Sequence, residues 1–312
     1  MVGYTKLCRP ILNFKSQTIY SWILLSVLGI IWGSSFLAIK IALISFQPLQ
    51  VSSLRIIIGF LTLITFLVLL RKGTLYRAKN QNYWITCLGV ALFSNAIPFT
   101  LLAIAQEHLS SVFVGLCMAT IPLVILFLTH LITTDEQISV HKILGILLGV
   151  CGTALLILSK EGMLQNSLSS NNNIFVWLCI LAPFCYGSGA IIIRKSQPIN
   201  YIEFSTHSLL IASLICLPFL ILLGEFPLDA NYQSIIATLY LGIFPTGIAT
   251  IILVSLIKTE GAIFISLVNF KVPIWSTIFG IFILREVLPN NFSVSFILIL
   301  SGVLICQIKT KK

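Results

Sequence analysis

The chain has 312 residues, of which 58% are hydrophobic and 9% are charged. Because a soluble domain carries about 25% charged residues, this composition excludes an ordinary soluble protein and predicts an all-α integral membrane protein. Apolar runs of about twenty residues without polar–apolar alternation exclude an outer-membrane barrel. The formal net charge is +10, but the basic residues lie in short connecting segments and tails, so we expect no nucleic-acid partner.

The apolar runs predict ten transmembrane helices. In chain order they cover 20–43, 48–70, 83–104, 111–132, 142–158, 174–193, 201–223, 234–257, 261–284 and 291–307. Residues 1–19 form an N-terminal tail, and since no cleavage site follows the first apolar run, we expect that run to be retained as a span. A Ser/Asn-rich linker, 159–173, separates two five-helix units. The units cover 20–158 and 174–307, and a tail of residues 308–312 follows the second.

The positive charges predict the orientation. With the N-terminus inside, fourteen of the 19 lysine and arginine residues fall in inner segments and two in outer loops, while Lys40, Arg55 and Lys271 lie within spans. Basic loops stay preferentially on the cytoplasmic side of a membrane. We therefore expect a multi-pass protein of the cell inner (plasma) membrane, with both termini in the cytoplasm.

The two units resemble each other as repeats. A shift of 151 residues places Pro122 on Pro273, and the WGS sequence at Trp32 resembles the YGS sequence at Tyr186. Because each unit has an odd number of spans, the second unit must run opposite to the first. Such inverted repeats place the substrate site where the halves meet near the membrane midplane.

The first two spans carry candidate site residues. Trp32 and Ser35 lie beside a stripe of small residues and can reach a cavity, and we include Tyr186, the counterpart of Trp32, as a substrate contact. Lys40 is close to the outer end of its span, where snorkelling to the headgroups and a ligand role are both open. Arg55 lies in the outer half of the second span with no acidic residue predicted at its depth. Structural bracing and substrate contact both stay open for it.

Two further polar residues lie within spans. Asn95 is near mid-depth beside Pro98, which predicts a kink that serves as a hinge or a wall of the site, or else an ordinary proline kink. His207 in the seventh span is a candidate proton carrier. The alternative for His207 is a plain hydrogen bond to a neighbouring helix.

The span 261–284 carries a single charge, Lys271, close to its midpoint. A lysine at this depth costs roughly 2.5–3.5 kcal/mol unless it faces the protein interior or a wet cavity. Pro273 lies two residues further on and predicts a kink or a local break beside the charge. The equivalent residue in the other repeat is Thr120, so the fold does not require the charge, and a ligand role is favoured.

Trp275 shares the face of Lys271 on an ideal helix. The roughly opposite stripe consists of Ser266, Asn269, Pro273, Ser276 and Gly280. We therefore expect Lys271 and Trp275 to face the cavity and contact the substrate, and the small stripe to pack on a neighbouring helix. The alternative is a lysine buried against backbone carbonyls without a ligand.

Four sequence segments complete the pattern. They are WGSSFLAIKIAL in the first span, SSLRIIIGF in the second, AQEHLSSVF ahead of the fourth and VPIWSTIFGIFILRE at the end of the ninth. Together with the ten spans, they resemble the EamA type of the drug/metabolite transporter superfamily over residues 20–307. The resemblance implies an inverted-repeat permease with a central cavity. Most members of the family lie in a bacterial inner membrane, and many of them are efflux proteins. It also implies family-typical positions at Trp32, Lys40, Arg55, Pro122, Pro273 and Glu286. Lys271 departs from the family, in which an apolar residue is more usual there, and we interpret it as a selectivity determinant.

These observations predict a secondary transporter that moves a small metabolite by alternating access. Because the three charges within the spans are positive, we expect export of an amino acid or another carboxylate-bearing metabolite. Uptake of a host or environmental metabolite is the alternative, and a membrane enzyme or lipid-handling protein is a more distant one. The sequence has no Walker, HExxH or metal-spaced carboxylate motif, so we expect no enzyme activity, no cofactor and no metal. The expected partners are the substrate and the lipid bilayer, and a homodimer stays open.

Overall fold

The computed structural model describes residues 19–69, 80–132, 140–158, 173–196, 200–222, 227, 229–261, 264–265, 267–288 and 291–306, and no strand forms within those ranges. The helices of the first half are α1 (Ile19–Ala42), α2 (Pro48–Leu69), α3 (Gln81–Val90), η1 (Ala91–Ala96), α4 (Ile97–His108), α5 (Ser111–Cys117), η2 (Met118–Thr120), α6 (Ile121–Ile132) and α7 (Val140–Leu158). Those of the second half are α8 (Asn173–Lys195), α9 (Tyr201–Leu222), α10 (Tyr232–Leu241), η3 (Gly242–Ile248), α11 (Ala249–Thr259), α13 (Val268–Phe282) and α14 (Phe292–Cys306).

The all-α membrane class predicted from composition is confirmed. Seven helical stretches are long and apolar enough to cross a membrane: 19–42, 48–69, 81–108, 111–128, 174–195, 201–221 and 232–259. Three of the ten predicted spans, 142–158, 261–284 and 291–307, coincide with shorter apolar helices at 143–155, 268–282 and 292–302. The protein is therefore a multi-pass membrane protein with at least seven helices of spanning length.

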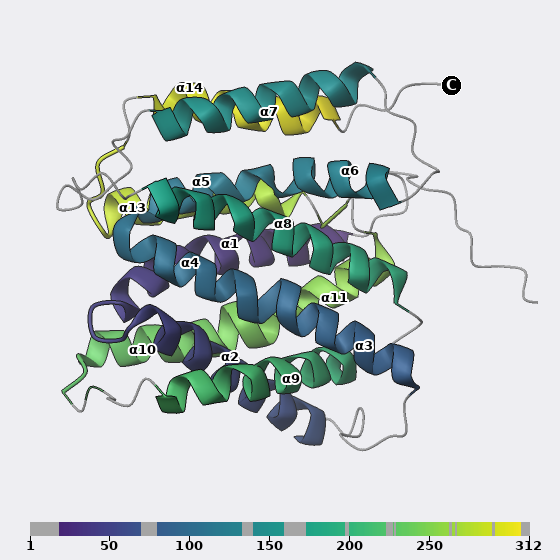
Figure 1. Cartoon of the computed structure of the whole chain (residues 1–312), viewed down its shortest axis with the longest axis vertical. Coiled ribbons are helices and arrows are strands. Elements are labelled where there is room, and N and C mark those ends of the chain that lie inside the picture. Colours follow the sequence, from purple (N-terminus) through teal and green to yellow (C-terminus); the bar gives the residue numbers. More distant parts are fainter. Residues whose placement is uncertain are drawn as a thin grey trace, which may run out of the picture.

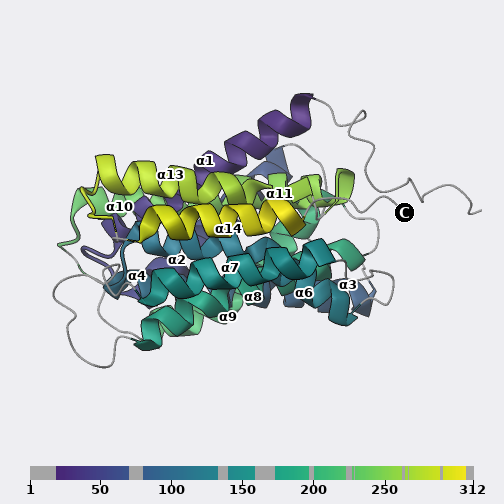
Figure 2. The same cartoon turned by 90° about the horizontal axis from the view of Figure 1, so that it is seen from above.

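Helices that are equivalent in the two halves pack against each other across the molecule (Figure 1). The pair α7–α14 lies at one edge of the bundle and α2 packs along α9 at the other. Between them, α1 packs on α13 and α10, while its equivalent α8 packs on α6 and α4. The first turns of α1 project from the bundle at the end where α8 finishes, so these equivalent helices run in opposite directions (Figures 1 and 2). This pattern of contacts fits a fold of two repeats.

Several helices begin at polar caps that the sequence supplies. The Asn80 side chain accepts from the Tyr83 backbone N–H at 2.9 Å, and the Ser110 hydroxyl accepts from the Phe113 N–H at 3.2 Å. Asn231 accepts from the Gln233 N–H in the same way at the start of α10. Each cap satisfies a backbone donor that has no partner within its own helix.

Both halves contain a π-helical segment in the middle of a long span. In η1 the Asn95 side-chain amide donates to the Val90 carbonyl at 3.1 Å, and in η3 the Thr246 hydroxyl donates to the Leu241 carbonyl at 2.8 Å. Each bond reaches back five residues, and the two positions are related by the 151-residue shift. A π-turn disturbs the regular backbone ladder, so a polar side chain that binds a carbonyl stabilises it, and such turns gather at functional sites. The kink predicted near Asn95 is therefore a π-helical turn.

The interruption predicted beside Pro273 lies earlier in the chain. The helix α13 runs through Pro273 without a break. The tight turn comes at Leu267, whose backbone N–H donates to the Phe264 carbonyl and whose carbonyl accepts from Phe270. These bonds span three residues instead of four, which tightens the backbone before α13 and leaves its later turns regular.

The end of α13 is tied to the first half through Glu286. Its carboxylate accepts from the Ser111 N–H at 2.8 Å, the Ser111 hydroxyl at 2.9 Å and the Val112 N–H at 3.0 Å. A carboxylate at the first turn of a helix satisfies free backbone donors and complements the helix dipole. The adjacent Arg285 has a positive φ of 54°, which turns the chain so that Glu286 reaches α5. Two oppositely charged neighbours in a loop usually form a solvated pair, but here the structure shows a cap that joins the two halves.

Candidate functional site

A cavity of about 110 Å³ lies between the two halves of the bundle. Its walls come from α1, α2, α3, η1, α4, η2, α6, α8, η3, α11 and α13. Most of the lining is apolar or aromatic, including Trp32, Phe36, Phe99 and Leu102. The polar members are Ser35, Arg55, Ser94, Asn95, Tyr186, Thr250 and Asn269. Such a largely apolar cavity with a few convergent polar groups is the usual form of a small-molecule site.

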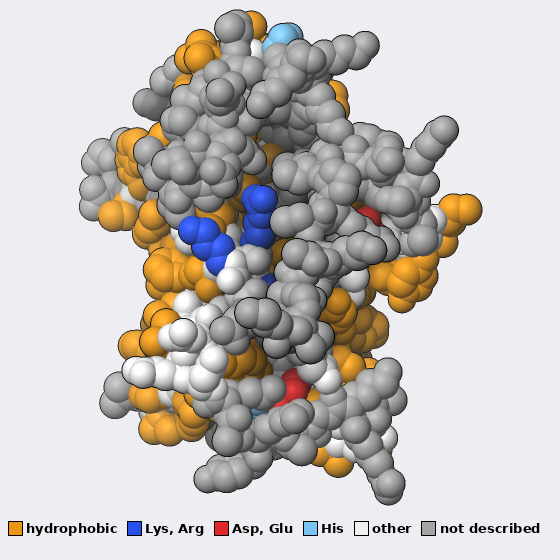
Figure 3. Space-filling model, turned by 90° about the vertical axis from the view of Figure 1, so that its right-hand side faces the viewer, with side chains coloured by type: hydrophobic (Ala, Val, Ile, Leu, Met, Phe, Trp, Pro, Cys, Tyr) orange, Lys and Arg blue, Asp and Glu red, His pale blue; other side chains and the backbone are white. Residues whose placement is uncertain are grey.

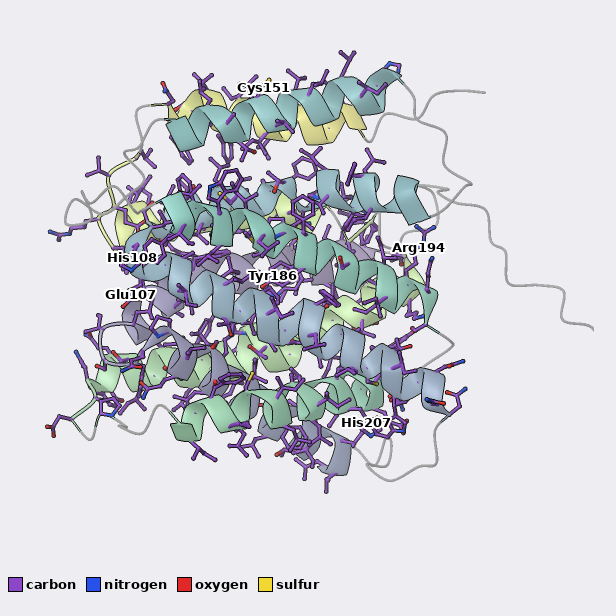
Figure 4. All side chains as sticks on the ribbon, viewed as in Figure 1. Glu107, His108, Cys151, Tyr186, Arg194 and His207 are labelled. Carbon is purple, nitrogen blue, oxygen red and sulfur yellow. The ribbon has the colours of Figure 1, made fainter. Side chains whose placement is uncertain are left out.

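Five of the nine residues predicted for the site line this cavity. They are Trp32, Ser35, Arg55, Asn95 and Tyr186. Tyr186 lies near the centre of the bundle in the view along its shortest axis (Figure 4). The structure thus brings together residues from four separate spans and from both halves.

Arg55 is the charged group of the cavity, and its side chain is only 3% exposed. Its Nε donates to the Thr246 hydroxyl at 3.1 Å, and its guanidinium carbon lies 3.7 Å from the centre of the Phe99 ring. Both contacts hold the guanidinium plane in place, and a ring face is a favourable neighbour for a cation. Within the described part of the chain, the structure shows no hydrogen bond from the two terminal nitrogens, and none of the lining residues is acidic. Bracing is therefore present, and donors remain for a ligand.

The hydroxyl and amide donors around Arg55 are used by the helices themselves. The Ser35 hydroxyl donates to the Trp32 carbonyl at 2.6 Å, and the Thr250 hydroxyl donates to the Thr246 carbonyl at 2.5 Å. The Asn95 amide donates to the Val90 carbonyl at the end of α3. The Tyr186 hydroxyl lines the same cavity. Arg55 and Tyr186 are both donors of a kind that suits an anionic group.

The prediction that Lys271 and Trp275 face the cavity is wrong in its geometry. The residues of α13 that line the cavity are Val268, Asn269 and Val272, on another face of the helix. Trp275 packs on Gly33 of α1, where an added Cβ would lie 2.4 Å from the Trp275 Cβ. The reason is that small residues on α1 allow α13 to approach closely with the face that carries the lysine and the tryptophan.

Lys271 itself lies along α1. Its stem is next to Gly29, where an added Cβ would be 2.7 Å from the Lys271 Cβ, and its ammonium donates to the Ser26 hydroxyl at 2.5 Å. The prediction that the opposite stripe packs on a neighbouring helix holds for only part of it. Ser276 does pack on Gly115 of α5, but Asn269 lines the cavity.

Lys40 has a structural environment outside the cavity. Its ammonium donates to the Gln106 carbonyl, and the Gln106 side-chain amide donates to the Phe36 carbonyl at 2.9 Å. These bonds join α1 to α4 near the end of the bundle that carries Glu107 and His108 (Figure 4). The hydrogen bond to Gln106 accounts for the position of Lys40. Neither of the two predicted alternatives, a headgroup contact or a ligand, is needed to explain it.

His207 lies away from the cavity, buried between α3 and α9. Its Nδ1 is 2.8 Å from the Tyr83 hydroxyl, and its ring centre is 4.9 Å from that of Trp84. The view of all side chains places it toward the end of the bundle that carries Arg194 (Figure 4). The structure thus shows the hydrogen bond to a neighbouring helix, and a proton-carrying role stays a prediction.

Five polar or aromatic residues of the lining were not predicted: Phe36, Ser94, Phe99, Thr250 and Asn269. The repeat contains a signal for some of them. A shift of 151 relates Met118 to Asn269 and Ile121 to Val272, and all four line the cavity. Equivalent positions around the two prolines would therefore have identified this wall. Among the described residues, no cluster of three His, Cys, Asp or Glu side chains could hold a metal ion.

Comparison with known proteins identifies the family. The model of the EamA-like transporter family matches residues 19–158 and again 173–307, that is, each half separately. The uncharacterized transporter YoaV of Bacillus subtilis is 25% identical, with 88% of this chain and 92% of YoaV covered. An uncharacterized transporter of Archaeoglobus fulgidus is 24% identical, with 91% and 97% covered. A solved crystal structure matches 93% of this chain and 97% of its own with a TM-score of 0.68 at 17% identity, which supports the fold. The two family matches across a two-repeat helical bundle show that the chain belongs to the EamA-like transporter family.

Proposed function

We propose that this membrane transporter moves a small carboxylate-bearing metabolite through the cavity by alternating access. The observation that carries the proposal is Arg55, a buried guanidinium in the wall of a cavity whose described lining residues include no acidic one. A buried charge is costly unless it is paired, and a carboxylate matches the planar guanidinium in a two-point arrangement. The substrate supplies the missing anion.

The rest of the lining indicates what the carboxylate is attached to. Trp32, Phe36, Phe99 and Leu102 offer apolar and aromatic surface. An ammonium group of an amino acid would meet only ring faces, amides and hydroxyl oxygens there. The recognised group is therefore the carboxylate, on an apolar body, and both amino acids and deaminated acids are candidate substrates.

We propose ten spans with both termini in the cytoplasm of a cell with an inner membrane. The three shorter apolar helices then complete five spans in each half. Arg194 and Lys195 are exposed at the end of α8, and Lys and Arg side chains lie near the middle of that face of the molecule (Figure 3). Basic side chains favour the cytoplasmic surface, so this end is the inner one. We propose export as the direction, because the family resembled by the sequence contains many exporters.

Flux measurements in proteoliposomes test the substrate class. The panel pairs each aromatic or branched-chain acid with three analogues: its amide, its 2-amino acid and its 2-oxo acid. We expect saturable flux for the acids and none for the uncharged amides, which retain the body and lose the anion. A panel in which amides move as fast as acids, or in which no member shows saturable flux, would overturn the proposal.

Membrane vesicles of both orientations test the direction. An exporter loads everted vesicles with substrate faster than it loads right-side-out vesicles under the same imposed gradient. The reverse preference would support uptake instead. A fusion reporter after Lys312 tests the topology separately, and a periplasmic signal would contradict the ten-span arrangement.

A further inference from the structure

Lys271 has an environment that the transport cavity does not explain. Its stem begins beside Gly29 of α1, and its ammonium reaches Ser26, three residues closer to the start of that helix. Three residues correspond to about 4.5 Å of helix rise. The side chain therefore lies along α1 and carries its charge toward the end of the bundle where α1 begins.

That end of the bundle is marked by two contacts. The Ser21 hydroxyl donates to the Glu260 carboxylate at 2.7 Å, and the rings of Trp22 and Phe264 meet edge to face with centres 5.0 Å apart. Ser26 is five residues beyond Ser21 on α1, or about 7.5 Å along the axis. A lysine whose ammonium is this close to the carboxylate and indole ring at the end of the bundle can reach the headgroup region by snorkelling.

The surface around Lys271 is apolar and open to the membrane. Ile23 is 54% exposed, Val27 and Ile30 are exposed one and two turns further along α1, and Ile274 is exposed on α13. Trp22, also exposed, lies in the first turn of α1, and indole rings favour the membrane interface. An acyl chain can cover these residues while its headgroup stays at the level of Ser26.

The ammonium of Lys271 has three donors, and the described residues supply one acceptor, Ser26. No ion pair of Lys271 occurs among them, and the nearby Glu260 carboxylate is bonded to Ser21. A phosphate oxygen would satisfy the remaining donors and neutralise the charge. A free phosphate ion would gain the same contact but would not cover the apolar flank.

We propose that Lys271, Ser26 and Trp22 form a binding site for an anionic phospholipid, in the groove between α1 and α13 and in the leaflet at the start of α1. The phosphodiester contacts Lys271 and Ser26, and an acyl chain lies over Val27, Ile30 and Ile274. This site is separate from the substrate cavity, since the cavity-lining residues of α13 are on another face. It explains why a lysine is tolerated at this position within the spans.

Native mass spectrometry of the purified full-length protein tests the site with phosphatidylglycerol and phosphatidylcholine of the same chains. We expect Lys271→Gln to weaken phosphatidylglycerol binding at least fivefold and leave phosphatidylcholine binding unchanged. Arg194→Gln is the matched control, because it removes one exposed positive charge at the same end of the bundle and should have no such effect. Equal phosphatidylglycerol affinity of Lys271→Gln and the unmodified protein would overturn the proposal. If millimolar inorganic phosphate displaces phosphatidylglycerol, the site binds a simple anion, and the phospholipid proposal is overturned.

A second measurement needs no change at Lys271. Phosphatidylglycerol with brominated chains should quench the fluorescence of Trp22 more strongly than brominated phosphatidylcholine does, and Trp22→Phe should remove the difference. Equal quenching by the two lipids would contradict the site. Flux through the cavity in neutral lipid should persist in Lys271→Gln, which separates a failure of this proposal from a failure of the transport proposal.

Discussion

Arg55 and Lys271 are both positive charges within predicted spans, yet the structure gives them opposite surroundings. Arg55 is buried, braced by Thr246 and Phe99, and part of the cavity wall. Lys271 is partly buried, lies along α1 where α1 and α13 pack together, and has a serine as partner. The depth of a charge in a span therefore does not indicate its role. The direction in which its helix face points decides whether it lines the cavity or lies against another helix.

The largest expected effect separates these two charges directly. We expect Arg55→Gln to lower kcat/KM for a transported acid about 10- to 100-fold, since hydrogen bonds to charged groups contribute about 1.5–3 kcal/mol. Lys271→Gln should change kcat/KM less than twofold. Both values come from initial-rate flux in proteoliposomes with matched protein amounts. A larger loss in Lys271→Gln than in Arg55→Gln would reverse the comparison.

A bulky residue at Gly33 tests what keeps Lys271 outside the cavity. Gly33→Leu places a side chain where Trp275 and the Val272 carbonyl already lie, and overpacking costs about 1–3 kcal/mol. We expect a clear drop in the thermal unfolding midpoint in detergent, whereas Val27→Leu, at an exposed position of the same helix, should leave it unchanged. An unaltered midpoint in Gly33→Leu would mean that α1 and α13 are not held this closely.

Glu286, just beyond the other end of α13, tests how this helix is held to the first half. Glu286→Gln keeps the shape of the side chain and removes the charge that caps α5, so we expect a loss of about 1 kcal/mol in stability. Glu107→Gln is the control, because that carboxylate is half exposed and its contact is a 3.8 Å approach to His108. If the two variants unfold at the same temperature, the cap does not hold α13 to the first half.

The smallest effect concerns the brace on Arg55. Thr246→Val keeps the volume of the side chain and removes both the acceptor for Arg55 and the bond to the Leu241 carbonyl. Losing one such hydrogen bond costs about 0.5–1.5 kcal/mol, so we expect KM to rise between two- and tenfold with kcat little changed. Thr62→Val is the control, since its hydroxyl binds only its own helix at Ile58. A change in kcat without a change in KM would indicate that Thr246 acts through a movement of the π-turn. It would contradict a role of Thr246 in positioning Arg55.

Hydropathy and the internal repeat, both properties of the sequence, predict much of this protein. The backbone N–H and C=O groups of a long apolar run find no water within the membrane and must form hydrogen bonds inside the run. Such runs therefore form helices whatever their neighbours are. The repeat predicts two similar halves, and the family model matches each half separately. Arg55 and Asn95 could be identified because charged and amide side chains within spans are costly and favour the interior. Trp32 and Ser35 could be identified by their place beside a stripe of small residues, and Tyr186 as the counterpart of Trp32 in the repeat.

The assignment of faces on α13 depended on the tertiary structure. Helical periodicity groups Lys271 with Trp275 and separates both from Asn269, but it is equally satisfied when either group faces the cavity. The cost of a charge in the membrane does not decide between them, since a cavity and a snorkelling path both reduce it. Gly29 and Gly33 decide it, because they allow α1 to contact the lysine-bearing face of α13, and that contact joins residues more than 230 positions apart in the chain.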